Sequence, residues 1–241
     1  MRNGCRIGVV IPALDEEQAI ARVVGDIPSW ADEIVVADNG SRDGTARAAK
    51  KAGARVVREE ERGYGAACQA GIHALEAADI VVFLDGDYSD YPEEMAAIVD
   101  PITTGPVDLV IGSRVLGRAA RGSLTPQQRF GNWLACLLIG RLWGVAYTDL
   151  GPFRAIRRDV LERLKMTDRN YGWTVEMQIK VAKLGLPYLE VPVSYRPRIG
   201  ASKVSGTLLG TVMAGCKILA LIGNAAVRSR TCDAGARNRP T

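Results

Sequence analysis

The chain has 241 residues, of which 47% are apolar and 24% charged, and its formal net charge is +4. These values suit one large α/β domain, or a domain with a small appendage, and exclude global disorder. Lysine and arginine are scattered without the block typical of a nucleic-acid arm, so the positive excess favours anionic substrates or an anionic membrane surface and not nucleic acid. Five widely spaced cysteines and an N-terminus without a signal-peptide pattern predict reduced thiols in the cytoplasm.

Short apolar runs alternate with helix-like segments in the first half of the chain. We expect strands at residues 7–11, 34–37, 55–57, 80–84 and 109–111, and helices at 16–26, from 45 onward and at 66–78. This alternation predicts a mainly parallel sheet with helices on both faces. Ligands of such sheets bind beyond the carboxyl ends of the strands. The polar residues that follow these predicted strands are Asp15, Glu16, Asp38, Asp85, Asp87, Ser113 and Arg114.

The pattern changes after Arg114. The sequence predicts a loop at 118–126, a nearly all-apolar helix at 132–144, an amphipathic helix at 174–184 and a strand at 189–196, followed by a long, Gly-rich apolar segment at 204–227. We therefore expect a globular domain over residues 1–203, an apolar helix over 204–227 and a flexible polar tail over 228–241.

The most informative motif is Asp85-Gly86-Asp87, which ends a buried apolar strand. Residues i and i+2 of extended backbone point the same way, so the two carboxylates can converge. Two like charges there need a cation or a shared proton. Hard oxygen ligands at this spacing suit Mg²⁺ or Mn²⁺ holding a substrate diphosphate. Such pairs also occur in solvated turns.

Three further motifs each allow two interpretations. Residues 38–45 form either a plain tight turn or part of a nucleotide pocket in which Asp38 accepts hydrogen bonds. Residues 62–67 are either an ordinary helix start or a place where glycines and a helix N-terminus admit an anionic ligand. Residues 196–203 are either a solvated basic loop or a mobile loop over phosphates, with Arg198 as a fork and Lys203 as a point charge.

Taken in order, eight segments resemble the family-2 glycosyltransferases of the dolichyl-phosphate mannose/glucose synthase-like group, which are polyprenyl-phosphate glycosyltransferases. These segments are 10–17, 38–45, 62–67, 85–87, 112–114, 149–154, 171–180 and 195–203. The resemblance implies a GT-A fold and a nucleoside-diphosphate sugar donor of the GDP-mannose or UDP-glucose type. It also implies a divalent metal, Mg²⁺ or Mn²⁺, and inverting transfer of a hexose to a polyprenyl or dolichyl phosphate.

The resemblance also implies roles for individual residues. The nucleotide-sugar positions are Pro12, Ala13, Glu16, Asp38 and Asp85, and the metal positions are Asp85 and Asp87. The acceptor-phosphate positions are Arg114, Arg129, Arg198, Ser202 and Lys203. The expected catalytic residues are Asp87, Arg114 and Asp149. A phosphate monoester is largely dianionic at neutral pH, so such an acceptor needs positioning more than a general base.

Two features concern the membrane. Residues 204–227 have about the length of a bilayer span, roughly 20 residues, but Lys217 and several glycines interrupt them. We therefore expect 132–144 and the C-terminal segment to lie in the membrane interface, with Trp133 and Trp143 as suitable side chains, or to pack in a homo-oligomer. This predicts a protein peripherally associated with the cytoplasmic face of the membrane.

Three alternatives remain open. A family-2 enzyme of cell-envelope polysaccharide synthesis would act on a hydroxyl acceptor and need a carboxylate base, for which Asp149 is the best candidate. A sugar-nucleotide pyrophosphorylase would show a basic Gly-rich loop after the first strand, whereas residues 12–16 are acidic. The intact acidic pair disfavours a non-catalytic adaptor. On the acceptor side, Leu150-Gly151-Pro152 replaces the Ser-Gly that the family has before its Phe-Arg.

Overall fold

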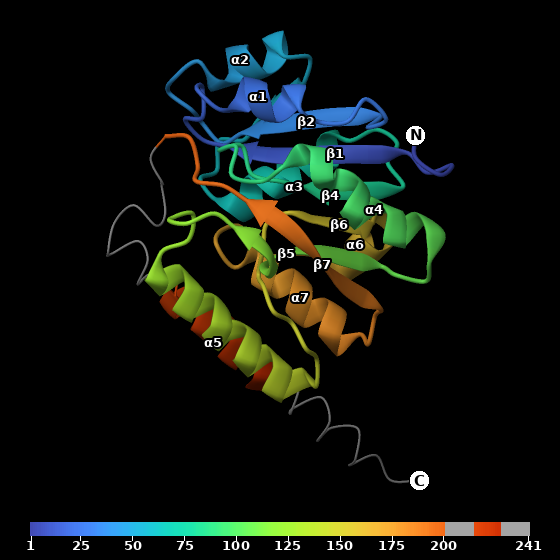
Figure 1. Cartoon of the computed structure of the whole chain (residues 1–241), viewed down its shortest axis with the longest axis vertical. Coiled ribbons are helices and arrows are strands. Elements are labelled where there is room, and N and C mark those ends of the chain that lie inside the picture. Colours follow the sequence, from blue (N-terminus) through green and yellow to red (C-terminus); the bar gives the residue numbers. More distant parts are fainter. Residues whose placement is uncertain (201–214, 228–241) are drawn as a thin grey trace.

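The computed structural model describes residues 1–200 and 215–227 of the chain (Figure 1). The strands are β1 (Ile7–Ala13), β2 (Glu33–Asp38), β3 (Arg55–Arg58), β4 (Ile80–Phe83), β5 (Leu109–Ala119), β6 (Arg154–Arg157) and β7 (Tyr188–Tyr195). The helices are α1 (Ile20–Gly25), α2 (Thr45–Lys51), α3 (Tyr64–Ala74), the 3-10 turn η1 (Pro92–Glu94), α4 (Met95–Thr104), α5 (Pro126–Trp143), α6 (Arg158–Leu164) and α7 (Trp173–Lys183).

All seven strands form one sheet in the order β3-β2-β1-β4-β6-β5-β7. Only β6 among these strands runs opposite to its neighbours, since it pairs antiparallel with both β4 and β5. The predicted α/β fold with a mostly parallel sheet is therefore confirmed. The carboxyl ends of β1, β2 and β4 lie at one edge of this sheet, because these strands pair in parallel.

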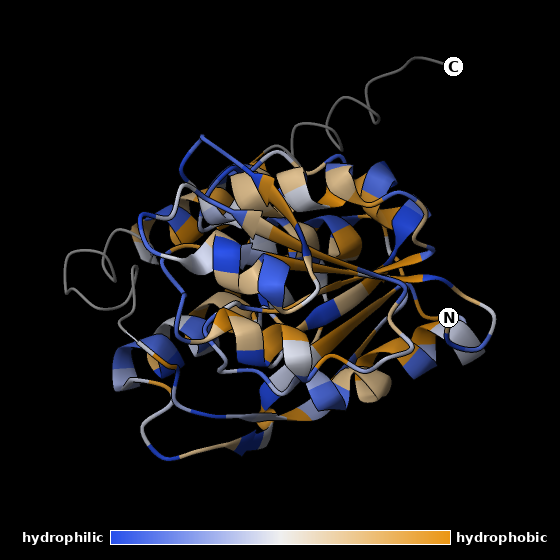
Figure 2. Cartoon of the chain, turned by 90° about the horizontal axis from the view of Figure 1, so that it is seen from above, coloured by the Kyte–Doolittle hydropathy of each residue, from blue (hydrophilic) through white to orange (hydrophobic). Residues whose placement is uncertain are grey.

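Alternate residues of the central strands pack into two separate cores, one on each face of the sheet. On β1, Val10 packs with α3, α5, α6 and α7, whereas Val9 and Ile11 pack with α1, α2 and α4. This two-residue alternation on buried strands explains why their sequences are continuously apolar. Figure 2 shows the apolar strands inside the molecule and hydrophilic positions on the outer sides of the helices.

Several predicted boundaries differ from the structure. The strand expected at 109–111 continues to Ala119, and the helix expected at 66–78 is Tyr64–Ala74. The helix expected from residue 16 begins only at Ile20, because Asp15 has a positive φ and Glu16 starts a turn instead. The helix expected from 132 begins at Pro126. There Thr125 and Gln128 form a capping box that satisfies the first N–H groups.

The described part of the C-terminal segment, residues 215–227, is helical. Ile218 and Ile222 pack against the core that also contains α5 and α7, and Lys217 forms an ion pair of 3.1 Å with Asp168. The tail predicted at 228–241 lies outside the described residues. Within residues 1–200 and 215–227, no helix combines the length and apolar character needed to cross a bilayer.

Candidate active site

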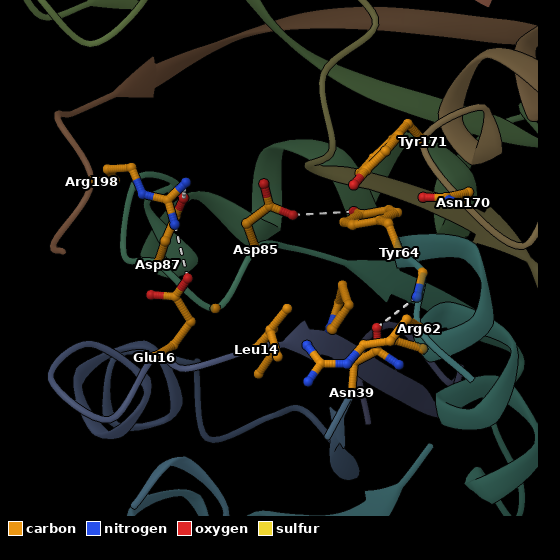
Figure 3. A pocket seen from close by; sticks show the side chains of 15 residues that line it. Leu14, Glu16, Asn39, Arg62, Tyr64, Asp85, Asp87, Asn170, Tyr171 and Arg198 are labelled. Atoms are coloured by element: carbon orange, nitrogen blue, oxygen red, sulfur yellow. Dashed lines mark hydrogen bonds and ion pairs between the residues drawn. The ribbon is translucent and has the colours of Figure 1, made fainter. Parts of the chain in front are cut away.

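A pocket of about 320 Å³ opens at the carboxyl edge of the sheet (Figure 3). Pro12 and Ala13 at the end of β1 form one wall, and Asp85 and Asp87 after β4 form the next. The pocket is completed by Leu14, Glu16, Asn39, Arg62, Gly63, Tyr64, Ala67, Gly86, Asn170, Tyr171 and Arg198. The strand-end placement of the acidic pair is therefore as the sequence predicts.

The acidic pair belongs to a small cluster with Asp90. The backbone N–H of Asp85 donates to Oδ2 of Asp90 over 3.2 Å, and Tyr64 donates its hydroxyl to Oδ1 of Asp85 over 3.1 Å. Burial, and then the negative charges of Asp87 and Asp90, raise the pKa of Asp85 well above its ordinary value. Burial and the charge of Asp87 raise the pKa of Asp90 to about 7. The cluster therefore carries more negative charge than its surroundings stabilise.

Arg198, from the segment after β7, supplies one cation to this cluster. Its Nη1 lies 3.3 Å from Oδ2 of Asp87, and its Nη2 donates to Oε1 of Glu16 over 2.8 Å. Figure 3 shows the guanidinium between these two carboxylates. The segment is further fixed by the N–H of Ile199, which donates to the carbonyl of Asp87 over 2.9 Å.

The residues present fit a divalent cation. Oδ1 of Asp90 is buried without a hydrogen-bond partner among the described residues, and the raised pKa of Asp85 shows that further positive charge would stabilise its ionised form. No cluster of three or more histidine, cysteine or acidic side chains in the described ranges is arranged to hold a metal alone. In Mg²⁺ sites, one or two carboxylates commonly share the ion with substrate phosphates.

The predicted catalytic residues Arg114 and Asp149 do not line the pocket and form an ion pair with each other. Nε of Arg114 donates to Oδ2 of Asp149 over 2.8 Å and its Nη2 donates to Oδ1 over 2.7 Å, which is the bidentate geometry of a strong ion pair. Burial alone would lower the pKa of Arg114, but the hydrogen bonds and charge of Asp149 raise it above its ordinary value. The Arg114 guanidinium lies 5.0 Å from the ring centroid of Tyr195, and Tyr195 forms a backbone bridge with Asp90, so the ion pair lies near the acidic cluster.

The structure brings together some of the predicted residues but not others. Asp38 is buried and does not line the pocket; its Oδ1 accepts a hydrogen bond from the N–H of Ser41, as in a tight turn. Arg129 is exposed on α5 and also lies outside the pocket lining. Ser202 and Lys203 fall outside the described residues. The roles assigned to these residues remain predictions.

Residues Arg62, Gly63, Tyr64 and Ala67 line the pocket, but two of the N–H groups at the start of α3 are not available to a ligand. The N–H groups of Gly65 and Ala66 donate to the carbonyls of Asn170 and Arg169, so these helix-terminal donors already have protein partners. A Cβ on Gly65 would lie 2.1 Å from the carbonyl oxygen of Asp168. This glycine therefore admits a neighbouring segment of the chain and not a ligand.

Sequence reasoning missed five polar pocket residues: Asn39, Arg62, Tyr64, Asn170 and Tyr171. Four of them lie inside motifs that the sequence singled out, but those motifs did not show which side chain faces the cavity. Asn39, and not Asp38 as expected, lines the pocket. Asn170 comes from a segment about 85 residues after the acidic pair, and only its hydrogen bond to α3 reveals the proximity.

A mostly parallel sheet with an acidic pair after a central strand defines this protein as a glycosyltransferase of the GT-A type. The chain belongs to glycosyl transferase family 2, whose pattern it matches over residues 8–165. The predicted family and fold are confirmed, and the protein is a hexosyltransferase.

Relatives of this chain include named polyprenyl-phosphate enzymes. It is 35% identical to a dolichyl-phosphate hexose transferase of Haloferax volcanii, over 82% of this chain and 86% of the relative. It is 30% identical to an undecaprenyl-phosphate mannosyltransferase of Micrococcus luteus, over 85% and 90% respectively.

A solved structure with a similar fold is glucosyl-3-phosphoglycerate synthase from Mycobacterium tuberculosis, in complex with Mn²⁺, UDP-glucose and phosphoglyceric acid. It has a TM-score of 0.73 and 27% identity over 92% of this chain and 80% of that one. The chain therefore resembles both lipid-phosphate transferases and an enzyme crystallised with a small phosphorylated acid.

Proposed function

We propose that this enzyme transfers a hexose from a nucleoside-diphosphate sugar, of the GDP-mannose or UDP-glucose type, to a polyprenyl phosphate with inversion at the anomeric carbon. The observation that carries the proposal is the acidic pair after β4, of which Asp87 is buried and Asp85 half-buried, inside a pocket that Arg198 also enters. The names of the relatives support a lipid-phosphate acceptor.

Asp85 and Asp87 would hold Mg²⁺ or Mn²⁺, and Glu16 shares the cation Arg198 with Asp87. A bound divalent ion supplies Lewis-acid stabilisation of the leaving diphosphate. Pro12, Ala13 and Asn39 shape the nucleotide end of the pocket. Asp38 would contribute there through the turn that it closes with Ser41.

On the acceptor side, Arg114 would hold the phosphate, together with Arg129, Arg198, Ser202 and Lys203. An oxygen of the acceptor phosphate attacks the anomeric carbon, a new carbon–oxygen bond forms, and the bond to the donor diphosphate breaks with its electron pair on the departing oxygen. A phosphate monoester with a second pKa of about 6 brings no proton that must be removed at neutral pH. Positioning and charge neutralisation are then the main contributions of the protein.

The exposed face of α5 suits a membrane surface. Phe130 and Trp133, 62% and 56% exposed, pack against each other with ring centroids 5.8 Å apart. The same helix exposes Arg129 and Arg141, so aromatic and basic side chains occur together as in interfacial helices. Trp143, in contrast, packs against the core. We therefore propose peripheral association with the cytoplasmic face of the membrane, near its lipid acceptor.

The test is donor turnover by the purified chain with GDP-mannose, UDP-glucose or UDP-N-acetylglucosamine, with Mg²⁺ or Mn²⁺, and with or without a short polyprenyl phosphate. Nucleoside diphosphate release that requires the lipid phosphate, with the sugar label entering the organic phase, is the expected result and identifies the sugar. Turnover with a hydroxyl compound but not with the lipid phosphate would refute the acceptor and favour the polysaccharide alternative.

A further inference from the structure

Residues 148–150 connect the ion pair of Arg114 to helix α5. The side-chain amide of Asn132, on α5, spans this segment: its Nδ2 donates to the carbonyl of Thr148 over 3.0 Å, and its Oδ1 accepts from the N–H of Leu150 over 2.9 Å. One side chain therefore satisfies the backbone on both sides of Asp149.

Asp149 uses its whole carboxylate to hold Arg114. Oδ2 accepts from the backbone N–H and from Nε of Arg114, both over 2.8 Å, and Oδ1 accepts from Nη2 over 2.7 Å. The Asp149 side chain is 0% exposed, so water cannot replace a lost contact there. The position of the Arg114 guanidinium therefore follows the position of Asp149.

Two other elements hold the same segment from behind. The carboxylate of Glu190, on β7, accepts from the N–H groups of Thr148 and Asp149, and Nε2 of Gln178, on α7, donates to the carbonyl of Asp149 over 3.0 Å. Gln178 is fully buried, and Glu190 is half-buried on the edge strand β7. Asn132 differs from them because it lies on the helix whose outer face carries the exposed Phe130 and Trp133.

We propose that Asn132 is a positioning residue that couples the placement of α5 to the placement of Arg114 through residues 148–150. Docking of the outer face of α5 on a lipid surface then fixes the guanidinium that receives the acceptor phosphate. The assignment of Arg114 to the acceptor rests on the proposed function, whereas the coupling of α5 to Arg114 rests on the hydrogen bonds alone.

The coupling is tested by amide hydrogen exchange, because the N–H of Leu150 and the N–H of Arg114 each report one end of the connection. In Asn132→Ala, exchange at both amides is expected to be at least about tenfold faster than in the unchanged protein, because the variant removes the side chain that holds residues 148–150 against α5. Exchange in β1 is expected to stay unchanged. Faster exchange at Leu150 with no change at Arg114 would overturn the proposal.

Gln127→Ala provides a matched control, because Gln127 is exposed on the same helix, and it is expected to change neither amide. If Asn132→Ala does not fold, Asn132→Asp keeps an oxygen for the N–H of Leu150 and loses only the donor to Thr148. In this variant, amide exchange at Arg114 is expected to be faster than in the unchanged protein, but by less than in Asn132→Ala. Unchanged exchange at Arg114 would count against the coupling.

Steady-state kinetics separates the coupling from the proposed function. In Asn132→Ala, the KM for polyprenyl phosphate is expected to rise about tenfold, the equivalent of 1.4 kcal/mol, while the donor KM is unchanged. Arg114→Lys already removes the bidentate ion pair, so adding Asn132→Ala to this variant is expected to raise the KM for polyprenyl phosphate little further. If the two rises in KM multiply fully, Asn132 does not act through Arg114. The expected exchange pattern without any lipid-phosphate turnover in the unchanged enzyme would refute only the proposed function.

Discussion

Asp87 uses both carboxylate oxygens within the protein. Oδ1 accepts from the N–H of Ser89 over 2.9 Å, and Oδ2 lies 3.3 Å from Nη1 of Arg198. An amide at this position keeps an oxygen for Ser89, so Asp87→Asn should fold normally. Its lost charge should lower metal-dependent nucleoside diphosphate release by about a hundredfold or more, a size typical for loss of one group that stabilises transition-state charge.

The measurement for Asp87→Asn is turnover with Mn²⁺ and the donor found active, together with the melting temperature. Asp159→Asn is a suitable control, because Asp159 is exposed in the first turn of α6, away from the pocket. Full activity in Asp87→Asn would disprove the metal role assigned to this residue.

The surroundings of Asp149 make this carboxylate unsuitable as a general base. Both of its oxygens accept hydrogen bonds from Arg114, and its side chain has no exposed surface. A general base must reach the proton that it removes, and Asp149 is instead committed to orienting a cation. This arrangement favours a phosphate acceptor over a neutral hydroxyl.

Helix α7 fixes the loop that carries Asn170 and Tyr171 into the pocket. The carboxylate of Glu176 accepts from the N–H groups of Thr167 and Asp168 and pairs with Lys180 over 2.8 Å. Burial opposes its ionisation, but the ion pair and hydrogen bonds hold the pKa of Glu176 below its ordinary value. Its contribution to stability is therefore complete above the pKa of the unfolded chain, about 4.3, and is lost as the pH falls through the lower folded pKa.

Glu176→Gln should lower the free energy of unfolding by about 1–2 kcal/mol at pH 7. The difference from the unchanged protein should be smaller at about pH 3, because this pH lies below the pKa of Glu176 in the unfolded chain, where the stabilisation from the lowered folded pKa is already being lost. Urea unfolding at the two pH values measures this. The exposed pair of Glu162 with Arg158 on α6 gives a control, since Glu162→Gln should cost at most about 0.5 kcal/mol. An equal loss for Glu176→Gln at both pH values would contradict the assignment.

Helix α5 combines a packed inner face with an apolar outer face. Replacing both Phe130 and Trp133 by serine removes the exposed aromatic pair without touching the buried Ala135, Cys136 and Ile139. Since each aromatic contributes roughly 1.5–3 kcal/mol when buried, affinity for vesicles containing phosphatidylglycerol should fall at least about tenfold. Cosedimentation with such vesicles measures the effect.

A control for the α5 variant is Leu184→Ser, which removes another exposed apolar side chain next to α7. It should leave vesicle affinity unchanged. Unaltered binding by the α5 double variant would remove the support for this helix as the membrane contact. Turnover with a short, water-dispersed polyprenyl phosphate should survive in both variants, because neither changes the pocket.

Across the whole molecule, the sequence predicted the central strands and the polar residues that follow them. Buried parallel strands read as apolar runs, so the polar residues after β1 and β4 could be placed at one edge. Strand β6 could not be found this way, because Arg154–Arg157 offers only two apolar residues between arginines. Its Arg154 is fully buried and bonded to the carbonyl of Gly151, a contact that only the tertiary structure creates.

The site joins parts that are distant in sequence, so ligand binding should stabilise the whole fold. Glu16, Asp87 and Arg198 come from three separate segments, and holding them together opposes unfolding of the domain. Donor and Mn²⁺ at about a hundredfold excess over Kd should add roughly 2.7 kcal/mol to the free energy of unfolding. For a chain of this size that corresponds to a rise of roughly 5–10 °C in melting temperature.

Calorimetry with donor alone, Mn²⁺ alone, both together, and both together with EDTA tests this linkage. The large shift should require both ligands, because the diphosphate and the carboxylates of Asp85 and Asp87 would share the cation. EDTA should abolish it, and Asp87→Asn should show little of it. An equally large rise in melting temperature with donor in the presence of EDTA would mean that the enzyme binds its donor without a metal. Arg198 alone would then neutralise the acidic cluster when the diphosphate binds.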